Sequence, residues 1–226
     1  MLYVSDYDIF VEPVRSVLII LQLMLSIGAL ILSFASLFYI KKYNPKSKRS
    51  YLFGLPLFFF LFGIMRGIFV YHDFYALDIL GRPLYILANT LLSLAFISLN
   101  NTIESNIFTR SKHIFTILGI ALLIIFIITA IPGFIIARYL VNIIIITQVI
   151  PSLAIYLNVS LKGTGQARNK AVLIVVGIIL LFTSSMLGLI NLVKLLDPIT
   201  TTILAPPISL IGLIFIGYGL LYSNLN

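Results

Sequence analysis

Seven long apolar runs dominate the sequence, at residues 15–41, 51–72, 80–102, 113–131, 135–161, 170–194 and 200–222. A helix needs about 20 predominantly apolar residues to cross the hydrocarbon core of a bilayer, and every run is about that long or longer. Backbone polar groups in lipid must pair within the spanning structure, which favours helices. The sequence therefore predicts an all-α fold, a polytopic membrane protein built as a seven-transmembrane-helix bundle. Because the connections are short, we expect one domain over residues 1–226.

The overall composition agrees with a lipid environment. Hydrophobic residues make up 61% of the chain and charged residues 10%, whereas about a quarter of the residues of a soluble domain are charged. The absence of cysteine excludes disulfides, thiolate metal sites and a cysteine nucleophile. The acidic start of the chain, with Asp6, Asp8 and Glu12 before a long first run, argues against a cleavable signal peptide.

The distribution of charge predicts the orientation. Ten of the fifteen basic residues follow the first, third and fifth runs, namely Lys41, Lys42, Lys46, Lys48, Arg49, Arg110, Lys112, Lys162, Arg168 and Lys170. Six of the seven acidic residues lie on the other side, and only Glu104 shares the basic side. Basic residues in short loops stay in the cytoplasm. We therefore expect a multi-pass protein of the cell membrane, with the amino terminus outside and the carboxy terminus in the cytoplasm.

The basic stretch KKYNPKSKRS, residues 41–50, has two interpretations. A run of lysines and arginines can bind nucleic acid, but the same residues next to a membrane helix are held by the anionic inner leaflet and set topology. The second interpretation agrees with the other two basic loops. We expect the lipid bilayer as a partner and no nucleic acid.

Arg66 stands out because it lies inside an apolar run, in the stretch GIMRGIFVYHDFY of residues 63–75. A guanidinium at that depth either snorkels to the outer interface, forms an ion pair with another helix, or belongs to a ligand or ion site. We expect it to point into the bundle, within reach of an acid or amide on another run; the candidate partners are Asp197, Asp78 and Asn89.

Several other polar residues share the outer half of the bundle with Arg66. Intramembrane polar and charged residues normally face the bundle interior or a water-filled cavity. We expect an outward-facing pocket with a cationic lining, deepened by a bend at Pro206-Pro207, that binds a small polar or anionic ligand. The candidate ligand-binding residues are Arg66, Arg82, Tyr85, Asn89, Asn142, Asn191 and Lys194.

Two runs have faces that predict packing rather than a site. Small or polar residues in the first run recur at steps of four and three, at Gln22, Ser26, Ala29, Ser33 and Ser36. One helix face of this kind lets another backbone approach closely. The fourth run has few polar residues, and we expect it to be the helix most exposed to lipid.

The sequence lacks the residues that the best-known active sites and cofactor sites of helical membrane proteins require. The seventh run has no lysine for a retinal Schiff base, and the two histidines lie at opposite membrane faces, which excludes a zinc or bis-histidine haem site. The acids lie too far out for aspartyl proteolysis, and no Gly-x-Ser-x-Gly sequence occurs. The GTG at residues 163–165 is too short for a phosphate-binding loop. We expect no enzymatic activity, no catalytic residues, no metal and no cofactor.

Two stretches carry a family resemblance. The turn NNTIESNIFTRSK after the third run and the stretch FGIMRGIFVYHDFY look like patterns in uncharacterised archaeal seven-helix membrane proteins. Some chains of that kind resemble the membrane input modules of sensor kinases. The resemblance implies a role in sensing and assigns no functional residues.

Three hypotheses for function follow. The first is a receptor or sensor subunit that binds a small ligand from outside and, because no output domain follows Tyr222, signals through a separate cytoplasmic or membrane partner. The second is a small-molecule transporter in which the fourth run links two parallel repeats of three helices, although the prolines of the two halves do not fall at matching positions. The third is a structural subunit of a membrane complex.

Overall fold

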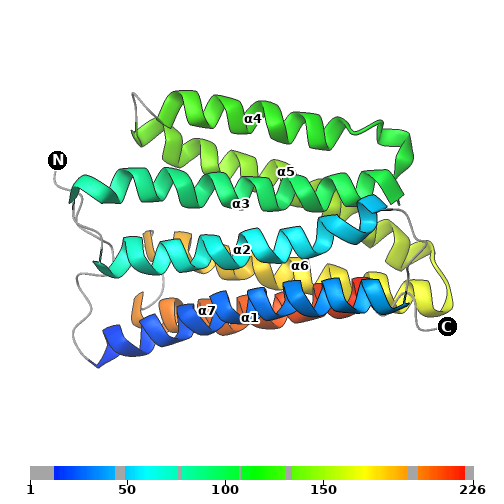
Figure 1. The fold of residues 1–226 in the computed structure, drawn as a ribbon, viewed down its shortest axis with the longest axis horizontal. Coiled ribbons are helices and arrows are strands. Elements are labelled where there is room, and N and C mark those ends of the chain that lie inside the picture. Colours follow the sequence, from blue (N-terminus) through cyan, green and yellow to red (C-terminus); the bar gives the residue numbers. More distant parts are fainter. Residues whose placement is uncertain are drawn as a thin grey trace.

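The described part of the chain folds into seven α-helices and one short 3₁₀ helix. The computed structural model describes residues 13–43, 49–75, 78–106, 108–130, 134–192 and 198–221. The elements are α1 (Val14–Tyr43), α2 (Arg49–Tyr75), α3 (Asp78–Asn106), η1 (Thr109–Ser111), α4 (Ile114–Ala130), α5 (Phe134–Lys162), α6 (Gly165–Leu192) and α7 (Pro198–Leu221), as Figure 1 shows. The prediction of an all-α fold with seven helices is confirmed.

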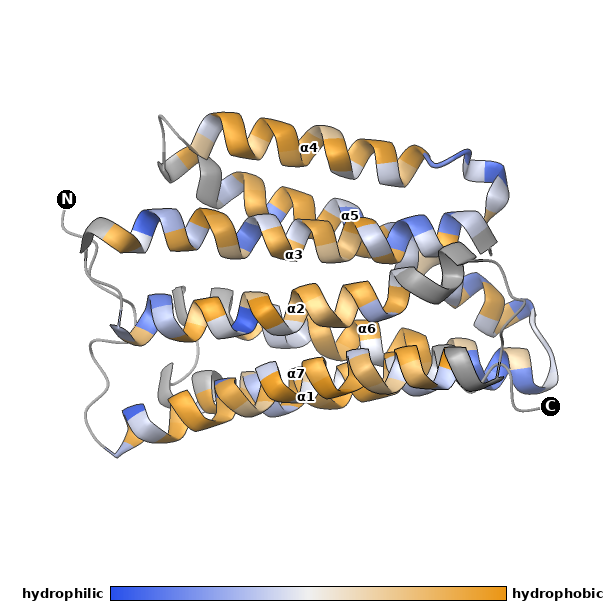
Figure 2. Cartoon of the chain, viewed as in Figure 1, coloured by the Kyte–Doolittle hydropathy of each residue, from blue (hydrophilic) through white to orange (hydrophobic). Residues whose placement is uncertain are grey.

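Five of these helices contain membrane-length apolar segments. The segments are Val14–Ile40, Gly54–Tyr75, Leu80–Ser105, Tyr139–Lys162 and Gly165–Ser185, and two shorter apolar segments cover Ile114–Ala130 and Ile203–Gly219. Figure 2 shows hydrophobic residues along the middle of the helices and hydrophilic residues gathered toward their ends. Large apolar side chains such as Phe34, Phe38 and Ile117 are exposed on the outside of the bundle. The chain is a multi-pass membrane protein.

Six helices form a closed ring, and one stands outside it. Around the ring each helix packs against the next, in the order α1, α2, α3, α5, α6, α7 and back to α1. Helix α4 packs on α3 and α5 alone among the main contacts, and it lies at the edge of the bundle in Figure 1. Its buried residues form one stripe, Gly119, Leu123, Phe126 and Ala130. This position outside the ring agrees with the expectation that the fourth run is the helix most exposed to lipid.

The small-residue face of α1 is the seam to α2. Its members Gln22, Ser26, Ala29, Ser33 and Ser36 are all buried. The hydroxyl of Ser26 donates to the carbonyl oxygen of Gly63 at 2.7 Å, and that of Ser33 donates to the carbonyl oxygen of Pro56 at 2.8 Å. A serine that bonds to a neighbouring backbone needs close helix contact, which the missing side chain of Gly63 allows. The predicted packing seam is confirmed.

Both ends of α4 are held by charged side chains of α3. At the start of α4 the Glu104 carboxylate accepts hydrogen bonds from the backbone N–H groups of Phe115, at 3.0 Å, and Thr116, at 2.8 Å. At its end the Arg82 guanidinium donates to the carbonyl oxygen of Ala130 at 2.7 Å. The first N–H groups and last carbonyls of a helix lack intrahelical partners, and the helix dipole favours an anion at the start and a cation at the end. Glu104, the one acid on the basic side, thus has a structural reason for its place.

The GTG at residues 163–165 lies at the tight connection between α5 and α6. Helix α5 ends at Lys162 and α6 begins at Gly165, which has a φ of 58°. Glycine adopts this left-handed conformation without a Cβ penalty. The stretch is a tight interhelical turn, which explains why α6 starts before the apolar run at residue 170.

Candidate functional site

A cavity of about 260 Å³ lies in the middle of the ring. Its described lining side chains come from all six ring helices, and α4 contributes none of them. Along α2 the lining runs from Phe58 to Phe69, which is about 16 Å of helix axis. Each ring helix would therefore contact a molecule that filled the cavity.

Arg66 lines this cavity from α2. The side chain is half-buried, and its guanidinium carbon lies 5.3 Å from the centre of the Phe62 ring one turn away. A cation over an aromatic face at this distance is attracted by the ring quadrupole, more strongly where water is scarce. Arg66 is the one charged side chain among the described lining residues. The expectation that Arg66 points into the bundle is confirmed.

The amide of Gln22 on α1 reaches the same level of the cavity. The Ser26–Gly63 hydrogen bond joins two antiparallel helices, so the residue one turn before Ser26 lies beside the residue one turn after Gly63. Gln22 therefore lies at the level of Arg66 and Gly67. It is only 9% exposed and lines the cavity. Among the residues that the structure describes, its Oε1 atom has no hydrogen-bond partner, which is unusual for a buried acceptor.

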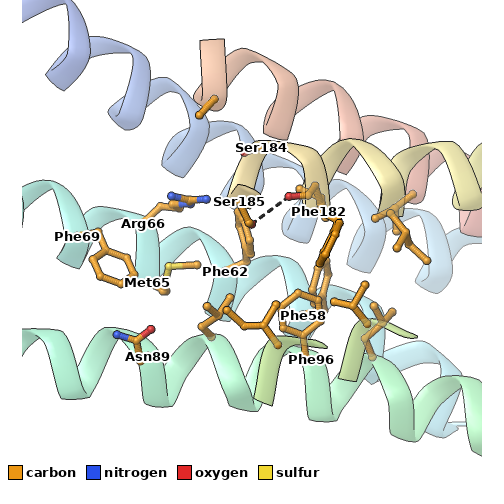
Figure 3. Close-up of a pocket in the computed structure, with 18 of the residues that line it drawn as sticks. Phe58, Phe62, Met65, Arg66, Phe69, Asn89, Phe96, Phe182, Ser184 and Ser185 are labelled. Atoms are coloured by element: carbon orange, nitrogen blue, oxygen red, sulfur yellow. Dashed lines mark hydrogen bonds between the residues drawn. The ribbon is translucent and has the colours of Figure 1, made fainter. Parts of the chain in front are cut away.

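Asn89 on α3 brings a second amide to the cavity. Its side chain is 3% exposed, and Nδ2 donates to the carbonyl oxygen of Tyr85 at 2.8 Å. Figure 3 shows Arg66, Asn89 and Phe69 toward one end of the cavity, and Phe58, Phe96 and Phe182 toward the other. The cavity thus has a polar end and an aromatic end.

The aromatic end offers little hydrogen bonding. The ring of Phe58 lies 6.0 Å from that of Phe62 and 5.8 Å from that of Phe96, centre to centre. Three serines also line the cavity, but each hydroxyl already has a partner: Ser184 pairs with Ser209, Ser185 donates to the carbonyl oxygen of Leu181, and Ser152 donates to Oδ1 of Asn100. The cavity is more apolar than the sequence indicated.

The seven candidate ligand-binding residues do not all meet in this cavity. Arg66 and Asn89 line it. Arg82 is exposed and bonds to the end of α4, and the Tyr85 ring packs against Phe69 and His72. Asn142 is half-buried on α5 and is not a lining residue.

The remaining candidates cannot be placed. Asn191 belongs to α6, but its side chain is not among those that the structure describes. Lys194 lies outside the described residues. Of the expected Arg66 partners, Asn89 shares the cavity, whereas the Asp78 side chain and Asp197 also fall outside the description.

A buried polar network connects α3 and α5 at the cavity wall, where the lining residue Ser152 donates to Oδ1 of Asn100. Asn100 donates through Nδ2 to the carbonyl oxygen of Gln148 at 3.0 Å and to its Oε1 at 2.7 Å. Gln148 donates in turn to the carbonyl oxygen of Phe115 on α4 at 3.3 Å. All members are deeply buried and satisfy one another, so the network fixes helix packing.

Sequence reasoning missed three parts of the site: Gln22 as a lining residue, the phenylalanine wall, and the network around Asn100. Gln22 carried a signal, because it is the one large polar residue on a face of small ones. The phenylalanines carried none, since rings at helical spacing are equally typical of a filled core.

Comparisons with protein-family models, with curated proteins and with solved structures find no match.

Proposed function

We propose that this chain is a receptor or sensor subunit whose seven helices all span the membrane, with the amino terminus outside. In this proposal a small ligand with an anionic group binds in the central cavity, and the signal passes to a separate partner. The observation that carries the proposal is the position of Arg66, a permanent cation that lines a cavity inside a membrane bundle. A guanidinium is the preferred partner of carboxylates and phosphates because it binds them bidentately.

The shape of the ring supports a signalling role. Six helices contribute to the cavity wall, so a ligand that binds there contacts elements from both ends of the chain. A ligand shifts a conformational equilibrium only through differential contacts with the two states. Contacts with six helices give many such opportunities, and the resemblance of two stretches to membrane input modules points in the same direction.

The test is ligand-linked stabilisation of the purified protein. We expect members of a panel of anionic metabolites to raise the melting temperature of wild type, by about 5 °C or more at a hundredfold excess over Kd. The variant Arg66→Lys should lose about tenfold or more in affinity, because an ammonium lacks the planar fork of a guanidinium.

The matched control is Arg15→Lys, since Arg15 donates to the carbonyl oxygen of Phe74 and does not line the cavity. Equal responses of the two variants would refute a ligand site at Arg66. Stabilisation by no member of the panel, with wild type folded, would favour the structural-subunit hypothesis.

A second candidate function, transport, is favoured by the pattern of helix contacts. In the first half α1 packs on α2 and α2 on α3; in the second, α5 packs on α6 and α6 on α7. The two halves contact each other where α3 packs on α5 and where α7 packs on α1, and α4 lies outside the ring. Exchange of the halves leaves this pattern unchanged, as expected for parallel repeats joined by a linker helix. Uptake of a stabilising ligand into proteoliposomes, lost in Arg66→Lys, would favour the transporter over the receptor.

A further inference from the structure

We propose that the ligand is an amphipathic carboxylate: one anionic head group, held between Arg66 and Gln22, and a short apolar tail that lies along the phenylalanine wall. This inference rests on the proposed function, because it names the chemical class that the same cavity would bind.

The head group is assigned from the polar end of the cavity. Arg66 is the one charged described side chain in the lining, and the N–H donors of its planar guanidinium can bind a carboxylate bidentately. Gln22 lies at the same level on the neighbouring helix, with Oε1 unpaired among the described residues. A half-turn of the Gln22 side-chain amide exchanges the positions of its oxygen and its N–H₂ group. In that orientation Gln22 can donate to a carboxylate oxygen. A buried amide oxygen without a hydrogen-bond partner is unusual, and this one lines the same cavity as the guanidinium.

The tail is assigned from the aromatic end. Phe62 and Phe58 line the cavity one and two turns below Arg66 on α2, and the Phe96 ring lies beside that of Phe58. Val149 of α5 also lines the cavity, and the nearby serines are already bonded within the protein. A polyol or an inorganic ion would leave its own hydrogen-bonding groups unpaired there, or leave the space unfilled. An alkyl or aryl tail fills it at no such cost.

The size of the cavity limits the tail. Its volume of about 260 Å³ lies just below the usual range for ligand pockets, about 300–1000 Å³. The cavity therefore favours a medium-chain acid over a membrane lipid with two full acyl chains. The same head-to-tail chemistry also occurs in anionic lipids, and the experiment separates the two sources.

The chain offers a clean reporter because it contains no tryptophan. Phe182 lines the cavity on α6, so Phe182→Trp places a unique indole beside the proposed tail. The protein is reconstituted in phosphatidylcholine nanodiscs, which hold no anionic lipid, and titrated with inorganic phosphate and with acetate, butanoate, hexanoate, octanoate and decanoate. Quenching of the indole by ω-bromooctanoate reports a tail in the cavity, and octanol controls for neutral partitioning.

We expect Kd to fall by about fourfold for each added methylene, from the transfer free energy of a CH₂ group, until the tail exceeds the cavity. Octanol should bind at least about tenfold more weakly than octanoate, and Arg66→Gln should weaken octanoate by about tenfold to a hundredfold. Arg15→Gln should leave the octanoate titration unchanged. In Val149→Phe, which narrows the aromatic end, the preferred chain should become shorter, a shift that misfolding cannot produce.

Two results would overturn the inference. Equal affinity for acetate, phosphate and octanoate, each lost in Arg66→Gln, would leave an anion site without a tail site, and the proposed function would survive alone. Binding of none of these probes by a folded protein would overturn both. Displacement of ω-bromooctanoate by phosphatidylglycerol, again dependent on Arg66, would support the amphipathic chemistry and assign the membrane as its source; failure of that lipid to compete would assign a free acid.

Discussion

The hydroxyl of Ser26 on α1 donates to the carbonyl oxygen of Gly63 on α2 at 2.7 Å, and this contact sets the level at which Gln22 and Arg66 face the cavity. The two helices approach closely because Gly63 has no side chain. A Cβ atom at Gly63 would lie 2.8 Å from Cγ of Leu30 and 3.0 Å from the carbonyl oxygen of Ser26. The geometry of the polar end therefore depends on a packing contact one turn away from it.

Substitution of Gly63 by alanine should destabilise the protein by about 1–3 kcal/mol, because the helices must separate to admit the methyl group. Gly67→Ala is the matched control on the same helix: its Cβ would lie 3.4 Å from Oγ of Ser26, an ordinary contact. We expect Gly67→Ala to be neutral or slightly stabilising, since alanine has the higher helix propensity. Thermal unfolding of both variants in one detergent gives the comparison, and equal melting temperatures would contradict it.

Removal of a charged group of α3 that holds α4 should loosen that helix locally. In Glu104→Gln a neutral amide replaces the carboxylate that accepts from Phe115, Thr116 and the Thr116 hydroxyl. A hydrogen bond to a charged acceptor contributes about 1.5–3 kcal/mol. We expect faster hydrogen exchange at the first turn of α4 in Glu104→Gln, and at its last turn in Arg82→Gln. Exchange that rises uniformly over the whole chain would contradict this local effect.

The network between Asn100 and Gln148 should show strong non-additivity. Asn100→Leu alone leaves Oε1 of Gln148 without its partner in a buried site, at a cost of about 1–3 kcal/mol. Replacement of both partners by leucine removes the unpaired groups together, so the double variant should be less destabilised than the sum of the single variants. A double-mutant cycle from chemical unfolding measures the coupling. Simple addition of the two single effects would mean that the amides do not interact.

The helices could be predicted because lipid imposes a strong rule on the sequence. A helix needs about 20 apolar residues to cross the bilayer. Because these residues are consecutive, the pattern can be recognised without knowledge of the tertiary structure. Helix ends were less predictable. Helix α6 begins at Gly165, before its apolar run. Its start is set by a glycine turn and by backbone hydrogen bonding, which do not depend on hydropathy.

The cavity could not be predicted in the same way, because it depends on the rotation of six helices relative to one another. Arg82 and Asn89 lie seven residues apart on one face of α3, so the sequence assigned them a common pocket. In the structure the long Arg82 side chain reaches the unpaired carbonyl at the end of α4, while the short Asn89 side chain stays at the cavity. Side-chain length and an available backbone acceptor decided the difference.

The orientation of the bundle is the remaining prediction, and the chain allows a direct test because it has no cysteine. Single cysteines introduced by Ser47→Cys and Gly133→Cys lie on opposite sides of the membrane if all seven helices cross it. The basic loops after the first, third and fifth runs place residue 47 in the cytoplasm and residue 133 outside. A membrane-impermeant maleimide added to intact cells should therefore label Gly133→Cys and leave Ser47→Cys unlabelled until the cells are lysed. The reverse pattern would invert the orientation. Labelling of both cysteines in intact cells would place both sites outside, so that an even number of membrane crossings would lie between them.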